Sequence, residues 1–178
     1  MTSSGSDHEM RDAPYYRPCV GAVLFNHEGL VWIGKRVSDS NDSLDYAWQM
    51  PQGGIDVGEE PKVAVMRELE EETGTDNADI IRESAHWFSY DLPQHLLGNT
   101  RKGSFKASFK GQTQKWFALR FKGTDSQFNL SQHEKPEFSE WRWVRLKEVP
   151  ELIVPFKSDV YKSVVAEFRD IPERIANE

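Results

Sequence analysis

The chain has 178 residues and a formal net charge of −7 at pH 7, with 38% hydrophobic and 12% aromatic residues. This composition predicts one globular domain with a substantial core and excludes an intrinsically disordered chain. No apolar run approaches the roughly 20 residues of a membrane-spanning helix, so we expect no membrane partner. We expect residues 1–14 to form a mobile polar arm, because they lack the apolar stretch of a signal peptide, and residues 15–178 to form a single domain.

The first predicted element contains the single cysteine of the chain. The runs CVGAVLFN (19–26) and LVWIGKR (30–36) flank the turn HEG and predict a β-hairpin. Cys19 lies in the first of these apolar runs, so a buried strand thiol is favoured over a catalytic thiol. One cysteine cannot form an internal disulfide, and we therefore expect a reducing, cytoplasmic compartment.

A turn-rich connection, WQMPQGG (48–54), precedes the next predicted element. Residues 60–73 predict a helix, with Pro61 in its first turn and Gly74 just past its end. Later stretches rich in aromatic and β-branched residues predict strands. These stretches are residues 80–92, which hold one or two strands, residues 114–121 and residues 138–146.

The last predicted element is an amphipathic helix near the C-terminus. Val160, Val164, Phe168 and Ile171 recur at spacings of four, four and three, which is the core stripe of such a helix. The simplest assembly of these elements is an α+β fold with three layers, α/β/α, in which a mixed β-sheet lies between helices.

The helix expected at 60–73 carries dense negative charge, since four of the five residues from Glu68 to Glu72 are glutamates. On a helical wheel, Glu68, Glu71 and Glu72 share a face about 100° wide, whereas Leu69 falls on a separate face that can pack. Carboxylates projected from one rigid element suit a hard divalent cation such as Mg²⁺. A solvated acidic face would give the same pattern, so the cluster alone leaves both interpretations open.

The spacing of the flanking residues favours the metal site. Eight positions across 22 residues carry this spacing: Gly53, Glu59, Arg67, Glu68, Leu69, Glu71, Glu72 and Gly74. The pattern resembles the signature of the Nudix hydrolases, with one departure where Thr75 replaces the usual aliphatic residue. The resemblance implies the Nudix fold, with a mixed sheet between helices. It also implies hydrolysis of a nucleoside diphosphate linked to another moiety.

Carried onto this chain, the resemblance assigns roles to the residues of the signature. Glu68, Glu71 and Glu72 would bind Mg²⁺, with Mn²⁺ or another divalent metal as an alternative. Arg67 would hold the glutamates in place, and Glu59 would support the site. Glycines would let the backbone pass close to the metal. The supporting glycines are Gly53, Gly54 and Gly74.

The likeness extends over roughly residues 15 to 170. It is carried by YRPCVGAVLFN, WQMPQGGID, GQTQKWFALRF, PEFSEWRWV and VPFKSDVYKSVVAEF. These stretches resemble the bacterial RNA pyrophosphohydrolases and the related diadenosine tetraphosphate hydrolases of plants and bacteria. Glu137 matches a glutamate that reaches the metal from outside the signature, as a ligand or as the base for water. The expected catalytic residues are therefore Glu68, Glu72, Glu137 and Arg67.

Other matched positions would contact the substrate. Tyr90 and Phe156 would stack on a base, although aromatic residues in strands are usually core residues. Phosphate or RNA contacts are expected at Arg17, Arg36, Gln112, Gln114, Lys115 and Lys157. Lys115 is the strongest of these from residues 92–124, which hold seven Lys and Arg and no acidic residue. Ordinary surface solvation is the alternative for the cationic positions.

Three functions remain open at this point. The first is an RNA 5′ pyrophosphohydrolase, which removes pyrophosphate from triphosphorylated RNA, initiates its decay and also acts on dinucleoside polyphosphates. The second is a diadenosine tetraphosphate hydrolase that produces ATP and AMP, which the long loop at 38–46 favours. The third is a non-catalytic binding module, which the complete set of glutamates disfavours. We expect no obligate protein partner for any of them.

Overall fold

The computed structural model describes residues 16–37, 48–94 and 109–178. The expected arm at 1–14 and the loop at 38–46 lie outside these ranges. The strands are β1 (Tyr16–Phe25), β2 (Val31–Arg36), β3 (Trp48–Gln49), β4 (Gln52–Gly54), β5 (Ala78–Glu83), β6 (Phe88–Asp91), β7 (Gly111–Phe121) and β8 (Phe138–Val144). The helices are α2 (Pro61–Thr73), α4 (Val149–Leu152), α5 (Ser158–Phe168) and α6 (Ile171–Ala176), with 3-10 turns η3 (Asp125–Gln127), η4 (Leu146–Glu148) and η5 (Pro155–Lys157).

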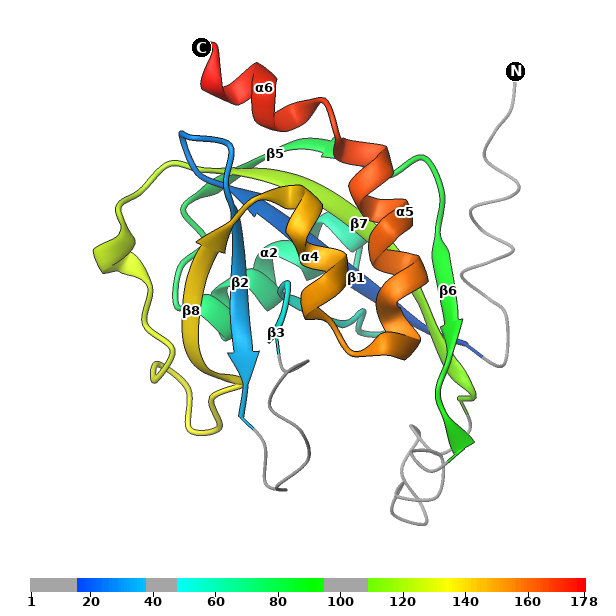
Figure 1. Ribbon diagram of the computed structural model, residues 1–178. Helices are drawn as coiled ribbons and strands as arrows, with labels where there is room; N and C mark the ends of the chain where they lie inside the picture. The colour runs from blue at the N-terminus through cyan, green and yellow to red at the C-terminus, as the bar shows by residue number, and fades with distance from the viewer. Residues whose placement is uncertain (1–15, 38–47, 95–108) are drawn as a thin grey trace.

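The described strands form one mixed sheet with helices on both faces. Its central order is β3-β2-β1-β7-β5, with β4 paired to β1, β6 to β7 and β8 to β2. Strands β1 and β7 are parallel, and the other pairs are antiparallel. Helix α5 lies over one face and α2 over the other (Figure 1). This confirms the predicted three-layer α+β fold.

An opening between β1 and β2 positions the functional site. The two strands pair only at Phe25 and Val31, next to their connecting turn, and diverge beyond it. Strand β4 occupies the opening and pairs with residues 19–21 of β1. Strand β4 immediately precedes the loop into α2, and its Gln52 N–H bonds Glu72 in the last turn of that helix.

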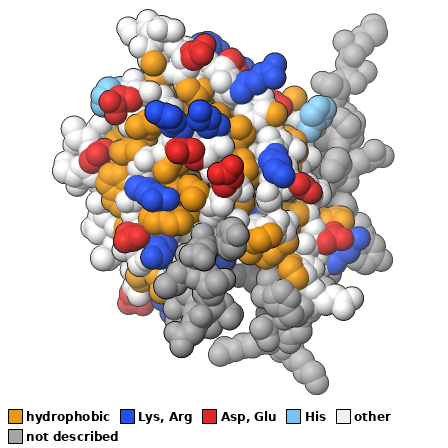
Figure 2. Space-filling view, viewed as in Figure 1, with side chains coloured by type: hydrophobic (Ala, Val, Ile, Leu, Met, Phe, Trp, Pro, Cys, Tyr) orange, Lys and Arg blue, Asp and Glu red, His pale blue; other side chains and the backbone are white. Residues whose placement is uncertain are grey.

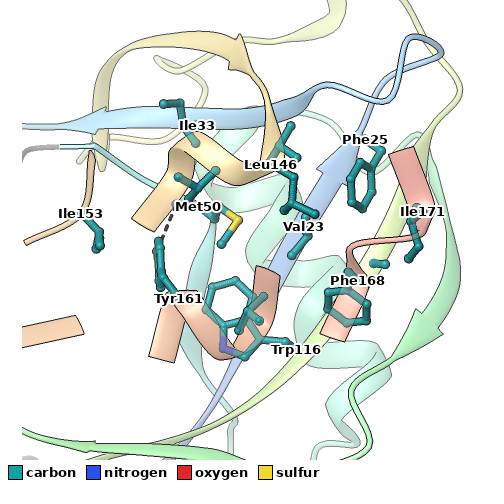
Figure 3. Close-up of a cluster of buried hydrophobic side chains, with 14 of the residues drawn as sticks. Val23, Phe25, Ile33, Met50, Trp116, Leu146, Ile153, Tyr161, Phe168 and Ile171 are labelled. Carbon is teal, nitrogen blue, oxygen red and sulfur yellow. Dashed lines mark hydrogen bonds between the residues drawn. The ribbon is translucent and has the colours of Figure 1, made fainter. Parts of the chain in front are cut away.

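Each face of the sheet carries its own apolar cluster. On the α5 face, the indole of Trp116 meets the ring of Tyr161 edge-on at 5.5 Å, and the Tyr161 hydroxyl accepts a hydrogen bond of 3.2 Å from the Met50 N–H (Figure 3). On the α2 face, Leu69 packs with Phe117 and other strand residues. Period-two alternation along β7 sends Trp116 to one cluster and its neighbour Phe117 to the other.

Most predicted elements are confirmed, with one correction at the C-terminus. The hairpin and the helix form as expected, and residues 80–92 contain two strands. The C-terminal stripe is divided between two helices, since α5 ends at Phe168 and Ile171 begins α6. The helix breaks there because Pro172 has no N–H to donate to the Phe168 carbonyl. Within the described ranges, no helix has the length and hydropathy needed to span a bilayer.

Candidate active site

Helix α2 is held in one rotation by packing on one side and a glycine turn at its end. Ala64, Val65 and Leu69 are buried against the sheet. Gly74 ends the helix with φ of 85°, a left-handed conformation that favours glycine. A Cβ at Gly74 would lie 2.5 Å from the carbonyl oxygen of Asn129, so the loop packs directly on this turn. The helix therefore presents a fixed set of carboxylates toward β4.

Thr75, the departure from the Nudix signature, is accommodated in this turn. Its side chain is buried, and its Oγ1 accepts a hydrogen bond of 3.1 Å from the Asn77 N–H. Its carbonyl oxygen accepts one of 3.1 Å from the Thr73 hydroxyl. The polar side chain thus fits a buried position because its hydroxyl has a partner.

Arg67 is the centre of a charged cluster on the outer side of this helix. Its guanidinium donates two hydrogen bonds of 2.8 Å to the Glu59 carboxylate and one of 2.8 Å to Glu68. It also donates to the Gly54 carbonyl oxygen at 2.9 Å and contacts Glu71 at 3.3 Å. The hydrogen bonds from Arg67 lower the pKa of Glu59, and those with Glu59 raise the pKa of Arg67. Arg67 thus ties the loop after β4 to the glutamates of α2.

Glu72 lies on the inner side of the helix, in the opening of the sheet. Its carboxylate accepts a hydrogen bond of 3.1 Å from the Gln52 N–H and is 9% exposed. Burial raises the pKa of Glu72 well above its usual range, and the negative charges of Glu137 and Glu68 raise it further. Glu72 therefore experiences the charges of two other carboxylates. These are Glu68, on the same helix, and Glu137, in the loop before β8.

Glu68 lies against the glycine pair of β4. A Cβ at Gly53 would overlap the Glu68 carboxylate, so only glycine leaves room for that side chain. Burial raises the pKa of Glu68, opposed by its hydrogen bond with Arg67. In the same way, the Arg17 guanidinium lies where a Cβ of Gly54 would be. Both glycines thus leave room for a charged side chain, and their close approach to a metal stays a prediction.

The donor set fits a hard divalent cation. Glu68, Glu72 and Glu137 would supply oxygen ligands, and a bound cation would relieve the repulsion that Glu68 and Glu137 exert on Glu72. Glu71 is about half exposed beside Arg67, at the solvent side of the same helix. Within the described ranges, no three acidic, His or Cys side chains already converge at metal-binding distance. The side chains would therefore have to turn toward the ion as it binds.

Glu137 and Arg36 form an ion pair whose charges both act on Glu72. The Arg36 Nε lies 3.5 Å from the Glu137 carboxylate, and both side chains are about half exposed. The Val37 N–H donates to the Glu137 carbonyl oxygen at 3.0 Å, which fixes the backbone next to β2. The Arg36 charge also acts on Glu72 and Lys157. The structure thus brings both residues to the carboxylate cluster, as expected.

Tyr90, Phe156 and Lys157 gather on the α5 face beside this opening. The rings of Tyr90 and Phe156 lie 5.9 Å apart at 44°, with the Lys157 ammonium 5.7 and 5.9 Å from their centres. Burial, together with the charge of Arg36, lowers the pKa of Lys157 to about 8, although Cys19, Glu137 and Glu72 act in the opposite direction. No described residue forms an ion pair with Lys157, and the buried Tyr90 hydroxyl has no hydrogen-bond partner among them.

The predicted residues of β7 separate into two groups. Gln112 and Gln114 lie on the α5 face, and Arg17 pairs with Gln112 in the register. Gln114 is 1% exposed. Lys115 is buried at 7% exposed and falls on the opposite face, in step with Phe117. A phosphate contact at Lys115 stays a prediction.

The basic segment at 92–124 does not form one continuous patch in the described structure. Arg120 pairs with Glu178, and Lys122 pairs with Asp79 at 2.9 Å, at the far end of β7 from Gln112. Over the face that carries α5, basic and acidic side chains are interspersed (Figure 2). Three further cations of the segment lie outside the described residues. These are Arg101, Lys102 and Lys106.

Sequence reasoning missed two residues that border this site. Gln52 bonds Glu72 through its backbone and Gln114 through its side chain at 2.6 Å. Its place directly before Gly53 was the available signal. Trp116, which is fully buried, donates its indole N–H to Gln114 at 3.0 Å. Cys19 is a buried strand thiol, as expected, and its charge effect reaches Lys157 and Tyr90.

The family model of the NUDIX domain matches residues 15–164. The chain belongs to the NUDIX family. This membership agrees with the glycine–carboxylate geometry of β4 and α2, and the family's general requirement is a divalent metal ion. The family match and the relatives described next indicate a NUDIX hydrolase, so the third interpretation, a non-catalytic module, is not supported.

Two relatives cover almost the whole chain. An RNA pyrophosphohydrolase of Brucella anthropi is 49% identical over 162 residues, covering 88% of this chain and 91% of its own length. An RNA pyrophosphohydrolase of Erythrobacter litoralis is 49% identical over 174 residues, covering 96% of this chain and 99% of its own. Both NUDIX relatives therefore carry the name of one of the two enzymatic functions that the sequence left open.

Solved structures confirm the fold. The MutT protein of Methanosarcina mazei Go1 matches with a TM-score of 0.57 at 20% identity, covering 87% of this chain and 96% of that one. The dihydroneopterin triphosphate pyrophosphohydrolase of E. coli matches with a TM-score of 0.56 at 18% identity, covering 85% and 98%. At these identities the likeness shows the NUDIX fold alone.

Proposed function

We propose that this protein is a cytoplasmic RNA 5′ pyrophosphohydrolase that removes pyrophosphate from triphosphorylated RNA. The observation that carries the proposal is the opening beside β4. There, carboxylates suited to a cation lie next to Arg36, Lys157 and the Tyr90–Phe156 pair. The identity of nearly half of all residues with RNA pyrophosphohydrolases supports RNA as the substrate. RNA decay is the process that such cleavage would initiate.

The carboxylates would hold the metal, which we propose to be Mg²⁺. Glu68 and Glu72 would be ligands from α2, with Glu71 and Glu137 completing the set from the solvent side. A bound divalent ion would polarise phosphoryl oxygens and lower the pKa of a coordinated water. Arg67 would keep Glu68 and Glu71 oriented, since it already bonds one and contacts the other.

The side chains of this chain would bind and orient the phosphates. Arg36 and Lys157 are cationic groups on the two sides of the carboxylate cluster, and Arg17 lies against Gly54. Positioning and charge neutralisation are the main tasks in phosphoryl transfer. Glu137 would accept a proton from the attacking water. It is more exposed than Glu72, so it can pass that proton to solvent.

Tyr90 and Phe156 would contact the first base. Their rings are tilted against each other, so a base would stack on the outer surface of the pair or separate the two rings. Such stacking contributes roughly 1–3 kcal/mol per base and tolerates different bases. This would let one site accept many RNA 5′ ends.

A rate comparison tests the proposal. Wild-type protein with Mg²⁺ is assayed on 5′-triphosphorylated RNA and on diadenosine tetraphosphate, with Glu72→Gln as the inactive control. We expect a much larger kcat/KM on RNA, with phosphate or pyrophosphate released. A larger value on the dinucleotide, with ATP and AMP as products, would instead assign the protein to the second function.

A further inference from the structure

Four side chains on β4 and β7 form a hydrogen-bonded chain that leads from the core to the site. The Trp116 indole N–H donates to Oε1 of Gln114 at 3.0 Å. Nε2 of Gln114 donates to Oε1 of Gln52 at 2.6 Å and to Oε1 of Gln112 at 3.1 Å. The chain therefore begins at a fully buried ring and divides into two branches.

The chemistry of the indole sets the direction of every bond in this chain. An indole N–H can only donate, so the side chain of Gln114 must turn its oxygen toward Trp116. The amide nitrogen of Gln114 then points to the other two glutamines, and both of its hydrogens are used. Because Gln114 is only 1% exposed, it is an internal connector with little surface to offer a ligand.

The consequence lies at the two ends of the chain. Gln52 and Gln112 both receive the bond through their oxygens, so both present their amide nitrogens away from Gln114. Neither nitrogen has a hydrogen-bond partner in the described part of the chain, and both side chains are partly exposed. The two amide nitrogens thus carry four N–H donors with no acceptor among the residues that the structure describes.

These donors lie beside the carboxylate cluster and the aromatic pair, where the proposed function places the phosphates. Gln52 bonds Glu72 through its backbone N–H at 3.1 Å, so its side chain borders the carboxylate cluster. Gln112 pairs with Tyr90 on β6 and with Arg17 on β1. The two amides therefore span the distance between the metal-binding glutamates and the aromatic pair. Phosphate oxygens only accept hydrogen bonds, whereas a reversed amide would face them with its own oxygen.

We propose that Gln52 is a phosphate-binding residue and that Trp116 and Gln114 are positioning residues, which keep the N–H groups of Gln52 and Gln112 directed at the substrate. This inference rests on the proposed function, because it takes the phosphate chain of the RNA 5′ end as the ligand. It gives Gln114 an indirect role and gives Gln52 a direct one.

Two single variants and one control test the inference. Gln52→Met removes the donors at nearly constant shape, and we expect about a tenfold rise in KM for 5′-triphosphorylated RNA with a smaller change in kcat. Trp116→Phe removes only the indole N–H and part of the ring, and we expect a rise of about threefold. Trp143→Phe is the matched control, because its indole bonds Asp125 at 3.1 Å, outside this chain of glutamines. We expect it to leave KM unchanged.

The double variant separates positioning from general damage to the core. If Trp116 acts through Gln52, the rise in KM of the double variant Gln52→Met/Trp116→Phe will be smaller than the product of the two single rises. Full multiplication would overturn the positioning role, and an unchanged KM in Gln52→Met would overturn the binding role. If Trp116→Phe lowers the melting temperature too far for assay, Gln114→Met interrupts the same chain and replaces it.

Titration with inorganic tripolyphosphate and Mg²⁺ distinguishes this inference from the proposed function. Calorimetry measures the phosphate contacts without RNA. Weaker tripolyphosphate binding by Gln52→Met supports the inference even if wild-type protein leaves RNA uncut, in which case only the proposed function fails. Equal binding by Gln52→Met and wild-type protein, together with normal RNA turnover, overturns the inference alone.

Discussion

Two groups of charged side chains lie on either side of β4 and differ in how their charges are matched. Around Arg67, the cation meets Glu59 and Glu68 at hydrogen-bonding distance inside the protein. In the opening, Glu72 and Lys157 are buried deeply, and no described residue forms an ion pair with either. A buried charge without a partner costs stability, so it is retained where a ligand will supply the partner. We therefore expect the first group to stabilise the fold and hold Glu68 in place, and the second to interact with the metal and the substrate.

The largest effect is expected for Glu72→Gln, which tests whether the buried charge in the opening serves activity and not stability. Glutamine keeps an oxygen for the Gln52 N–H but removes the charge, so we expect kcat on triphosphorylated RNA to fall by roughly 10²- to 10⁴-fold. Because burial raises the pKa of Glu72, loss of the charge should leave the melting temperature equal or higher. Steady-state kinetics and thermal unfolding measure the two effects.

The control for this variant is on the same helix. Glu70 is directed at Gln132 and His133 rather than at the opening, at 2.6 and 3.3 Å. Glu70→Gln should therefore keep its activity. Equal losses in both variants would show that negative charge on α2 matters in general and that Glu72 has no special place.

Arg67→Gln tests the other group, and its effect should appear in stability. Removal of the guanidinium leaves Glu59 and Glu68 beside each other with side chains that are only 12% exposed. We expect the free energy of unfolding to fall by about 2–3 kcal/mol, as measured by urea denaturation. Lys122→Gln, which removes an exposed pair with Asp79, should cost less than about 1 kcal/mol. Similar losses in the two variants would contradict the distinction between the groups.

The sequence predicts a group of charged residues well when its members are close together in the sequence, and less well when strand pairing brings them together. The wheel of α2 gave the shared face of Glu68 and Glu72, because helical spacing decides it. Arg36 and Glu137 could be placed only by resemblance, since β2 and β8 meet through sheet pairing between distant segments. Alternation along β7 places Lys115 on the same face as Phe117. Which layer that face packs against depends on how β7 pairs with β1.

Other features could not be read from sequence at all. The sequence PQGG indicates a turn, but it does not say that the Gln52 backbone will reach Glu72 across 20 positions. Likewise, the role of the Trp116 N–H depends on which partner the sheet places beside it. Buried hydrogen-bond partners are set by tertiary packing, and a strand pattern reports only which face a side chain takes.

The charge of Lys157 should make the activity of the second group depend on pH. Since burial lowers the pKa of Lys157 to about 8, the side chain is charged below that pH and loses its charge as pH rises through it. We expect kcat/KM on triphosphorylated RNA to fall about tenfold from pH 8 to pH 9.5, as fewer molecules carry the cation. Lys157→Arg stays charged and should lack this fall. A decline of the same size in the arginine variant would assign the titration to another group.

The smallest expected effect concerns an ion pair at the surface, Arg82 with Asp170. The guanidinium donates to the carboxylate at 2.6 Å and lowers the pKa of Asp170 below its ordinary value. A carboxyl with a lowered pKa stabilises the fold above its ordinary pKa, and this contribution is lost as pH falls through the lowered value. Asp170→Asn should therefore reduce the melting temperature slightly at pH 7 and not at all near pH 2.

The control is Asp159→Asn, whose contact with Lys162 is 3.9 Å long. Because the Arg82 pair is exposed, 0.5 M salt should weaken its effect, whereas the partly buried Arg67 cluster should keep most of its own. A pH-independent loss in Asp170→Asn would instead show that this residue acts through the packing of α6.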